Sequence, residues 1–114
     1  MTQLEKDRLI EKFMGWKITW KNGGWVWVDK DNKSLAKTCY ADSTLGFTTD
    51  WNWLMMALKR FDELTEMKSP FTIGEHQQYS SLCDQIDYAV TLYNIGDAVN
   101  ALCEGIEWYN KTLN

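Results

Sequence analysis

Histidine, proline and cysteine are scarce in this chain of 114 residues, which has one histidine, one proline and three cysteines. A single histidine among scattered carboxylates does not supply the clustered ligands of a zinc site, so we predict no metal and no cofactor. His76 lies in a polar run without a nucleophile motif, which is typical of a solvated side chain. We therefore expect no enzymatic activity, with a carboxylate pair such as Asp42 and Asp50 as the alternative.

The three cysteines, Cys39, Cys83 and Cys103, are odd in number and far apart. Their spacing fits neither a zinc site nor a set of disulfides, so we expect reduced, structural thiols. No apolar run reaches the length of about 18 residues that a membrane-spanning helix needs. No secretory signal is recognisable at the start of the chain. We expect a cytoplasmic protein with no membrane partner.

Positive charge is also in deficit. The chain has 12 basic and 16 acidic residues, a net charge of −4, which argues against nucleic-acid binding. The charges are unevenly distributed: residues 1–70 carry 11 basic and 10 acidic groups, whereas residues 71–114 carry 1 and 6. Lysines are concentrated between residues 17 and 37. One end of the molecule is therefore expected to be lysine-rich and the C-terminal part to be acidic.

Aromatic residues, by contrast, are abundant: the chain has seven tryptophans, five tyrosines and four phenylalanines. Lys17, Trp25 and Trp27 belong to a stretch in which lysines and tryptophans alternate closely. Lysines beside indole rings suit an anionic, planar ligand, which binds through charge and through stacking. The alternative is a hairpin whose lysines are solvated and whose tryptophans lie in the core. We take these three residues as candidate ligand contacts.

The first 28 residues predict a helix followed by a β-hairpin. Thr2 and Glu5 form a capping-box pattern, and Gly15 fits the left-handed stop of a helix over 2–14. Residues 16–20 and 25–28 read as strands joined by a glycine turn, and 38–40 is a weaker third strand. Both faces of 25–28 are apolar, so we expect it to be covered on two sides or at an interface in a homo-oligomer.

A second helix is predicted over 50–67, with Thr48, Thr49 or Asp50 as its cap. A helix start has free backbone N–H groups and a positive dipole end, which favour a bound anion. We therefore add the residues of this start to the candidate site: Thr48, Thr49, Trp51 and Trp53. Arg60 is a further candidate, because Trp53, Met56 and Met67 form a second apolar strip around it, outside the main core face.

Residues 71–95 allow two interpretations. The alternation over 86–93 favours a strand, and 71–73 resembles a strand tip, whereas a helix over about 75–93 is the alternative. A last helix is predicted from Gly96 to about residue 112. The elements predict a single α+β domain over 1–114, with a radius of about 13 Å, in which a small, largely antiparallel sheet packs between or against three helices, like an α-β-α sandwich.

Three short motifs occur in a familiar order: FMGW over 13–16, TDWNWLM over 49–55 and IEWYN over 106–110. In this order the chain resembles small uncharacterised proteins of bacteriophages and mobile elements, especially of Bacteroides-type bacteria, whose pattern is FMGW, SWDWLM and WYN. It is also distantly similar to the phage ABA sandwich domain. Asn52 stands where the pattern has Asp. The resemblance implies an accessory protein that acts in the host bacterial cytoplasm.

These observations predict a non-enzymatic phage-type binding module that sequesters a small anionic, nucleotide-derived ligand to counter host defence. The step from phage context to anti-defence is an analogy with other small phage proteins. The alternative is an interaction protein that inhibits a host defence protein through the Trp25/Trp27 or the Trp53/Met56 surface.

Overall fold

Four helices and a three-stranded antiparallel sheet make up the part of the chain that the computed structural model describes, residues 1–21, 23–31, 33–38 and 47–113. The predicted α+β class is confirmed. The elements are α1 (Gln3–Met14), β1 (Lys17–Lys21), β2 (Gly24–Val28), β3 (Ser34–Thr38), α2 (Trp51–Glu66), α3 (Ile73–Thr91), α4 (Ile95–Trp108) and a short π-helical segment, η1 (Tyr109–Leu113).

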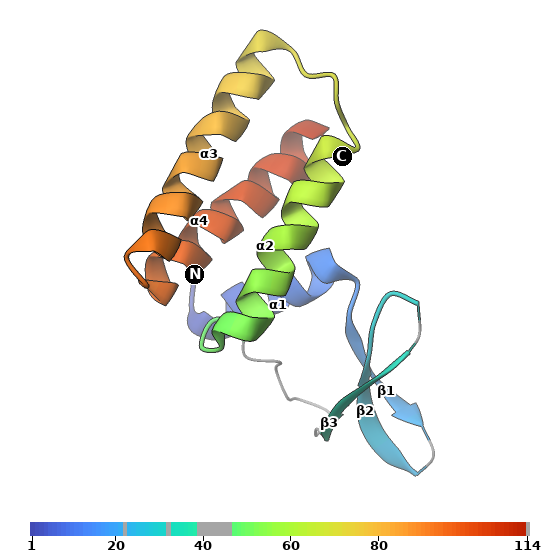
Figure 1. Ribbon diagram of the computed structural model, residues 1–114. Coiled ribbons are helices and arrows are strands. Elements are labelled where there is room, and N and C mark those ends of the chain that lie inside the picture. Colours follow the sequence, from blue (N-terminus) through green and yellow to red (C-terminus); the bar gives the residue numbers. More distant parts are fainter. Residues whose placement is uncertain (22, 32, 39–46, 114) are drawn as a thin grey trace.

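Helix α4 is the centre of the helical part. Helices α1, α2 and α3 all pack on it, and Figure 1 shows α2 and α3 on two sides of α4. Its sequence is apolar around most of its circumference, which is typical of a helix covered on several sides. The buried residues of α4 are Ala98, Val99, Ala101, Leu102, Cys103, Gly105 and Ile106.

The sheet packs against the helices at one end of the molecule and does not lie between helical layers (Figure 1). Its strand order is β1-β2-β3, and Ile18 is paired with Trp27 across the first two strands. Trp27 and Val28 are buried, which anchors the hairpin. The molecule is elongated, with extents of 51 × 29 × 21 Å and a radius of gyration of 14.9 Å, above the expected value.

The ends of the first two helices follow the sequence signals. The Thr2 hydroxyl accepts a hydrogen bond from the Glu5 N–H, and the Glu5 carboxylate accepts one from the Thr2 N–H. Gly15 ends α1 with a φ of 75°, the left-handed conformation that glycine adopts without strain. Asp50 caps α2 by accepting a hydrogen bond from the Asn52 N–H at 2.8 Å.

The strand prediction for 86–93 is wrong, because residues 73–91 form the long helix α3. Leu82, Ile86 and Ala89 are spaced at helical intervals and are all buried, so the helix buries them on one face. The strand tip at 71–73 is wrong for the same reason: Thr72 is the N-cap of α3, in a second capping box with Glu75. The structure therefore has four helices where three were expected.

Two boundaries also differ from the expectation. The last helix begins at Ile95, with Asn94 as its cap, and its α-helical part ends at Trp108. The third strand spans Ser34–Thr38, whereas the predicted positions 39 and 40 lie outside the described residues. None of the described helices is long and apolar enough to span a membrane.

Candidate functional site

Trp16 lies at the junction of the helices and the sheet and forms a wall of two cavities. It follows Gly15 directly, and its ring is buried against Phe47 and Trp53, with both centroids at 5.5 Å. One cavity, which we call the α1–α2 cavity, opens toward α2. The other, the hairpin cavity, opens between α1 and the strands.

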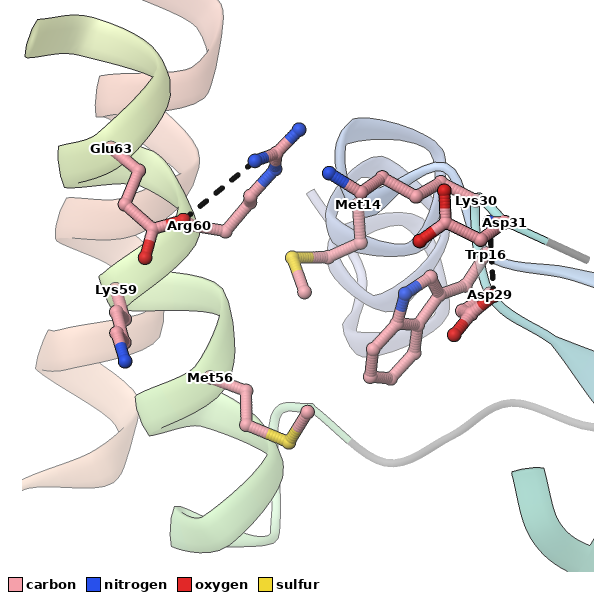
Figure 2. A pocket seen from close by; sticks show the side chains of 9 residues that line it. All are labelled: Met14, Trp16, Asp29, Lys30, Asp31, Met56, Lys59, Arg60 and Glu63. Atoms are coloured by element: carbon pink, nitrogen blue, oxygen red, sulfur yellow. Dashed lines mark hydrogen bonds and ion pairs between the residues drawn. The ribbon is translucent and has the colours of Figure 1, made fainter. Parts of the chain in front are cut away.

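The α1–α2 cavity has a volume of about 340 Å³ and is shown in Figure 2. Met14, Trp16 and Met56 form its apolar part. Lys30 and Arg60 point toward one another across its opening (Figure 2). Its other charged lining residues are Lys59, Asp29, Asp31 and Glu63, so positive and negative charges balance.

Two of the three acidic side chains of the α1–α2 cavity, Asp29 and Glu63, already have partners. Asp29 accepts hydrogen bonds from the backbone N–H groups of Asp31 and Lys33, both at 2.9 Å, which holds the turn between β2 and β3. Glu63 lies 3.7 Å from the Arg60 guanidinium. This cavity therefore offers a mixed electrostatic environment and no strong preference for an anion.

The hairpin cavity has a volume of about 460 Å³ and a positive lining. Its charged residues are Arg8, Lys12 and Lys17 against one acid, Glu11, which accepts a hydrogen bond from Arg8 at 3.0 Å. The rest of the lining is Trp16, Ile18 and Trp27. The lysine–tryptophan association predicted for Lys17 and Trp27 is thus present at this cavity.

Trp27 contributes an unusual group to this wall. Its side chain is only 1% exposed, and its Nε1 is the one buried side-chain nitrogen or oxygen without a hydrogen-bond partner in the described part of the chain. An indole N–H is a donor only, and a buried donor without an acceptor costs about 1–3 kcal/mol. The Trp27 N–H is therefore an unpaired donor next to the cavity, covered by the surrounding protein atoms.

At the predicted anion site at the start of α2, the donors of Thr48 already have an acceptor. The Thr48 N–H and hydroxyl both donate to the Asp7 carboxylate, at 3.1 and 3.3 Å, and the hydroxyl accepts from Gln3 at 3.0 Å. The Asp50 carboxylate occupies the helix end. Thr48 therefore joins α1 to the segment before α2, and a second anion at this end would be repelled.

The eight predicted site residues are distributed over separate places. Thr48 and Thr49 line a cavity of about 320 Å³ beside Lys6, while Lys17 and Trp27 line the hairpin cavity and Arg60 the α1–α2 cavity. Trp51 and Trp53 are half-buried and pack on the core. The Trp25 side chain lies outside the described part of the structure.

Several lining residues escaped the sequence reasoning. Trp16 and Lys30 belong to the stretch rich in lysine and tryptophan but were not among the candidate contacts, and Arg8 and Lys12 were assigned no role. Only the fold brings them together, since Gly15 reverses the chain and places β1 beside the last turns of α1. The adjacency of Trp16 to a helix stop was the one available signal for its position.

Two of the three thiols are described, and both are free. Cys103 is buried on α4, and burial raises the pKa of its thiol to about 11. No cluster of three or more histidine, cysteine, aspartate or glutamate side chains suited to a metal ion occurs within the described ranges.

The raised Cys103 pKa predicts a loss of stability at alkaline pH. Above the ordinary thiol pKa of 9.0 the unfolded chain releases this proton, whereas the folded chain retains it up to about pH 11. The free energy of unfolding should therefore fall between these two values, and Cys103→Ala should make the fall shallower. Urea titrations across this range test it, and equal slopes for the variant and the parent would contradict it.

No known protein-family model, curated protein or solved structure shows significant similarity to this chain.

Proposed function

We propose that this protein is a non-enzymatic binding module that captures a small anionic, nucleotide-derived ligand in the hairpin cavity. The observation that carries the proposal is the lining of this cavity, three basic side chains against one acidic one, beside Trp27, whose covered Nε1 has no hydrogen-bond partner. A phosphate group supplies the negative charge that such a lining favours.

The electrostatics distinguish this cavity from its neighbour. The hairpin cavity has two more basic than acidic lining side chains, whereas the α1–α2 cavity has three of each. Both share the Trp16 wall, so the difference lies in Arg8, Lys12 and Lys17. An anion would gain from the hairpin cavity and little from the other.

The burial of the two indoles defines what the cavity would recognise. Trp16 is 8% exposed and Trp27 is 1% exposed, so neither offers an open ring face for stacking a base. Both side chains act as walls of the cavity. We therefore infer that the anionic group of the ligand, and not its base, provides the main recognition.

Charge reversal at Lys17 tests the site. Lys17→Glu should weaken the binding of ADP by about tenfold or more, because it replaces an attractive charge at the cavity by a repulsive one. Lys33→Glu is the matched control, since Lys33 is an exposed lysine of the same sheet region and lines neither cavity. Titration calorimetry with ADP, inorganic phosphate and adenosine measures the effect. Equal losses in the two variants, or adenosine binding as well as ADP, would refute the site.

The indole N–H provides a direct spectroscopic test. In an NMR spectrum of the ¹⁵N-labelled protein, the Trp27 indole signal, assigned by Trp27→Phe, should shift when ADP is added. The Trp108 indole already donates to Gln78 at 2.6 Å and serves as the internal reference. A Trp27 signal that stays in place while ADP binds would show that the ligand lies elsewhere.

Sequestration and catalysis differ in the fate of the ligand. A sequestering protein returns the captured molecule unchanged, so mass spectrometry after heat release should recover intact nucleotide. The phage resemblance, through the motifs at 13–16, 49–55 and 106–110, adds the context in which such capture would counter host defence. Recovery of a converted product would make the protein an enzyme.

A further inference from the structure

A groove lies between α2 and α3, and its described lining residues all belong to these two helices. Both helices pack on α4 and run beside one another after a short connection (Figure 1). The space between them has a volume of about 320 Å³. Its lining residues are Met55, Leu58, Lys59, Asp62, Cys83, Ile86, Asp87 and Val90.

The floor of this α2–α3 groove is apolar. Leu58 and Ile86 are buried there, and Met55 is 47% exposed at its edge. Burial raises the pKa of the Cys83 thiol, and the nearby carboxylates of Asp62, Asp87 and Asp84 raise it further, against a hydrogen bond with Tyr79 that lowers it. The thiol is therefore neutral and behaves as part of the apolar floor.

The rim of the groove is acidic. The lining has two acidic residues, Asp62 and Asp87, and among the described residues Lys59 is its only basic one. The surroundings have the same sign, since α3 contains Glu75, Asp84 and Asp87 and no lysine or arginine. The α2 edge carries Lys59 beside Asp62, whereas the α3 edge is acidic; an apolar floor beside such an edge is complementary to an apolar stripe flanked by basic side chains.

We propose that the α2–α3 groove docks an amphipathic helix of a partner protein, with an apolar stripe and flanking lysines or arginines. The two side-by-side, antiparallel helices accept a third helix along their length, with side chains of the stripe entering the groove at intervals of one turn. Met55 gives the edge an adaptable, unbranched side chain that suits such a partner. This docking is independent of ligand capture in the hairpin cavity.

The test uses two synthetic helical peptides of about 15 residues with the same leucine stripe. One carries lysine at the remaining positions and the other carries glutamate. The lysine peptide should bind saturably in fluorescence anisotropy, and the glutamate peptide should bind at least about tenfold more weakly. Bound lysine peptide should also slow the alkylation of Cys83, followed by peptide mapping.

Two matched variants locate the binding. Met55→Lys places a cation at the edge of the groove and should lower the affinity for the lysine peptide by about tenfold or more. Met67→Lys makes the same change near the end of α2, where Met67 is 75% exposed and outside the groove, and should leave affinity unchanged. Both variants should bind ADP as the parent does, so a failure of peptide docking can be told apart from a failure of ligand capture in the hairpin cavity.

Three results would overturn the proposal. Equal weakening by Met55→Lys and Met67→Lys would show non-specific attraction to an acidic protein. Equal affinity for the two peptides would remove the role of the acidic rim. A parent protein that sediments as a dimer and becomes monomeric with Met55→Lys would assign the groove to a second copy of the chain.

Discussion

Phe61→Ala is expected to destabilise the protein by about 3–5 kcal/mol, the largest effect of any substitution proposed for this chain. Phe61 is fully buried on α2, and its ring contacts Phe13 of α1 and Tyr79 of α3 at centroid distances of 6.2 and 6.1 Å. The same ring lies against Gly105 of α4. Its removal would leave a cavity at the point where all four helices meet.

Urea unfolding followed by circular dichroism measures this loss. The matched control is Phe71→Ala, because the Phe71 ring is only half-buried and contacts Tyr79 alone among the described rings, at 5.8 Å. It should lose roughly 1 kcal/mol, the scale of one aromatic contact. Losses of equal size in the two variants would mean that Phe61 is not the centre of the helical core.

Gly105→Val is expected to destabilise the protein by about 1–3 kcal/mol, although glycine is a poor helix former. A Cβ atom at position 105 would lie 2.8 Å from the tip of the Phe61 ring, closer than real atoms approach. The ring is buried and has no free space to withdraw into. The close contact of α4 with α2 therefore requires the absence of a side chain.

Gly74→Val on α3 is the control for this substitution, since a Cβ atom there meets nothing within 4 Å. It should change the free energy of unfolding by less than about 0.5 kcal/mol. Combining Gly105→Val with Phe61→Leu should cost less than the sum of the two single changes, because the smaller side chain relieves the clash. Additive losses would refute the proposed contact.

The ends of α1 and the start of α2 were the most predictable part of the fold. Thr2 with Glu5, Gly15 and Asp50 each act through local hydrogen bonds or backbone conformation, so their effect is readable from a few adjacent residues. The hairpin followed from the glycine turn between two alternating segments in the same way. These signals do not depend on distant parts of the chain.

Helix α3 was harder to predict because its apolar residues fit both the two-residue period of a strand and the 3.6-residue period of a helix. Residues 86–93 alternate like a strand, while Leu82, Ile86 and Ala89 also share a helical face. The choice depends on what covers that face, and α4 covers it. The capping box of Thr72 and Glu75 was present in the sequence and would have favoured the helix.

The sequence indicated the types of side chain that line the hairpin cavity, lysine and tryptophan, but not all of the residues that do so. Lys17 and Trp27 were correctly associated with one another, because they lie on paired strands. Arg8 and Lys12 were not, because a helix and a strand meet there through the fold. At the start of α2, the Asp7 carboxylate of α1 accepts hydrogen bonds from both donors of Thr48, a contact between distant segments that the sequence did not indicate.

The position of α4 has a consequence for biosynthesis. Helices α1, α2 and α3 are completed before it, yet each of them packs on it. As the nascent chain leaves the ribosome, apolar side chains that are buried in the folded protein stay exposed until residues 95–108 emerge. Examples are Leu54, Phe61 and Ile86. Cooperative folding of the helical part is thus deferred until α4 has been synthesised, and the chain without α4 is the form most in need of a chaperone.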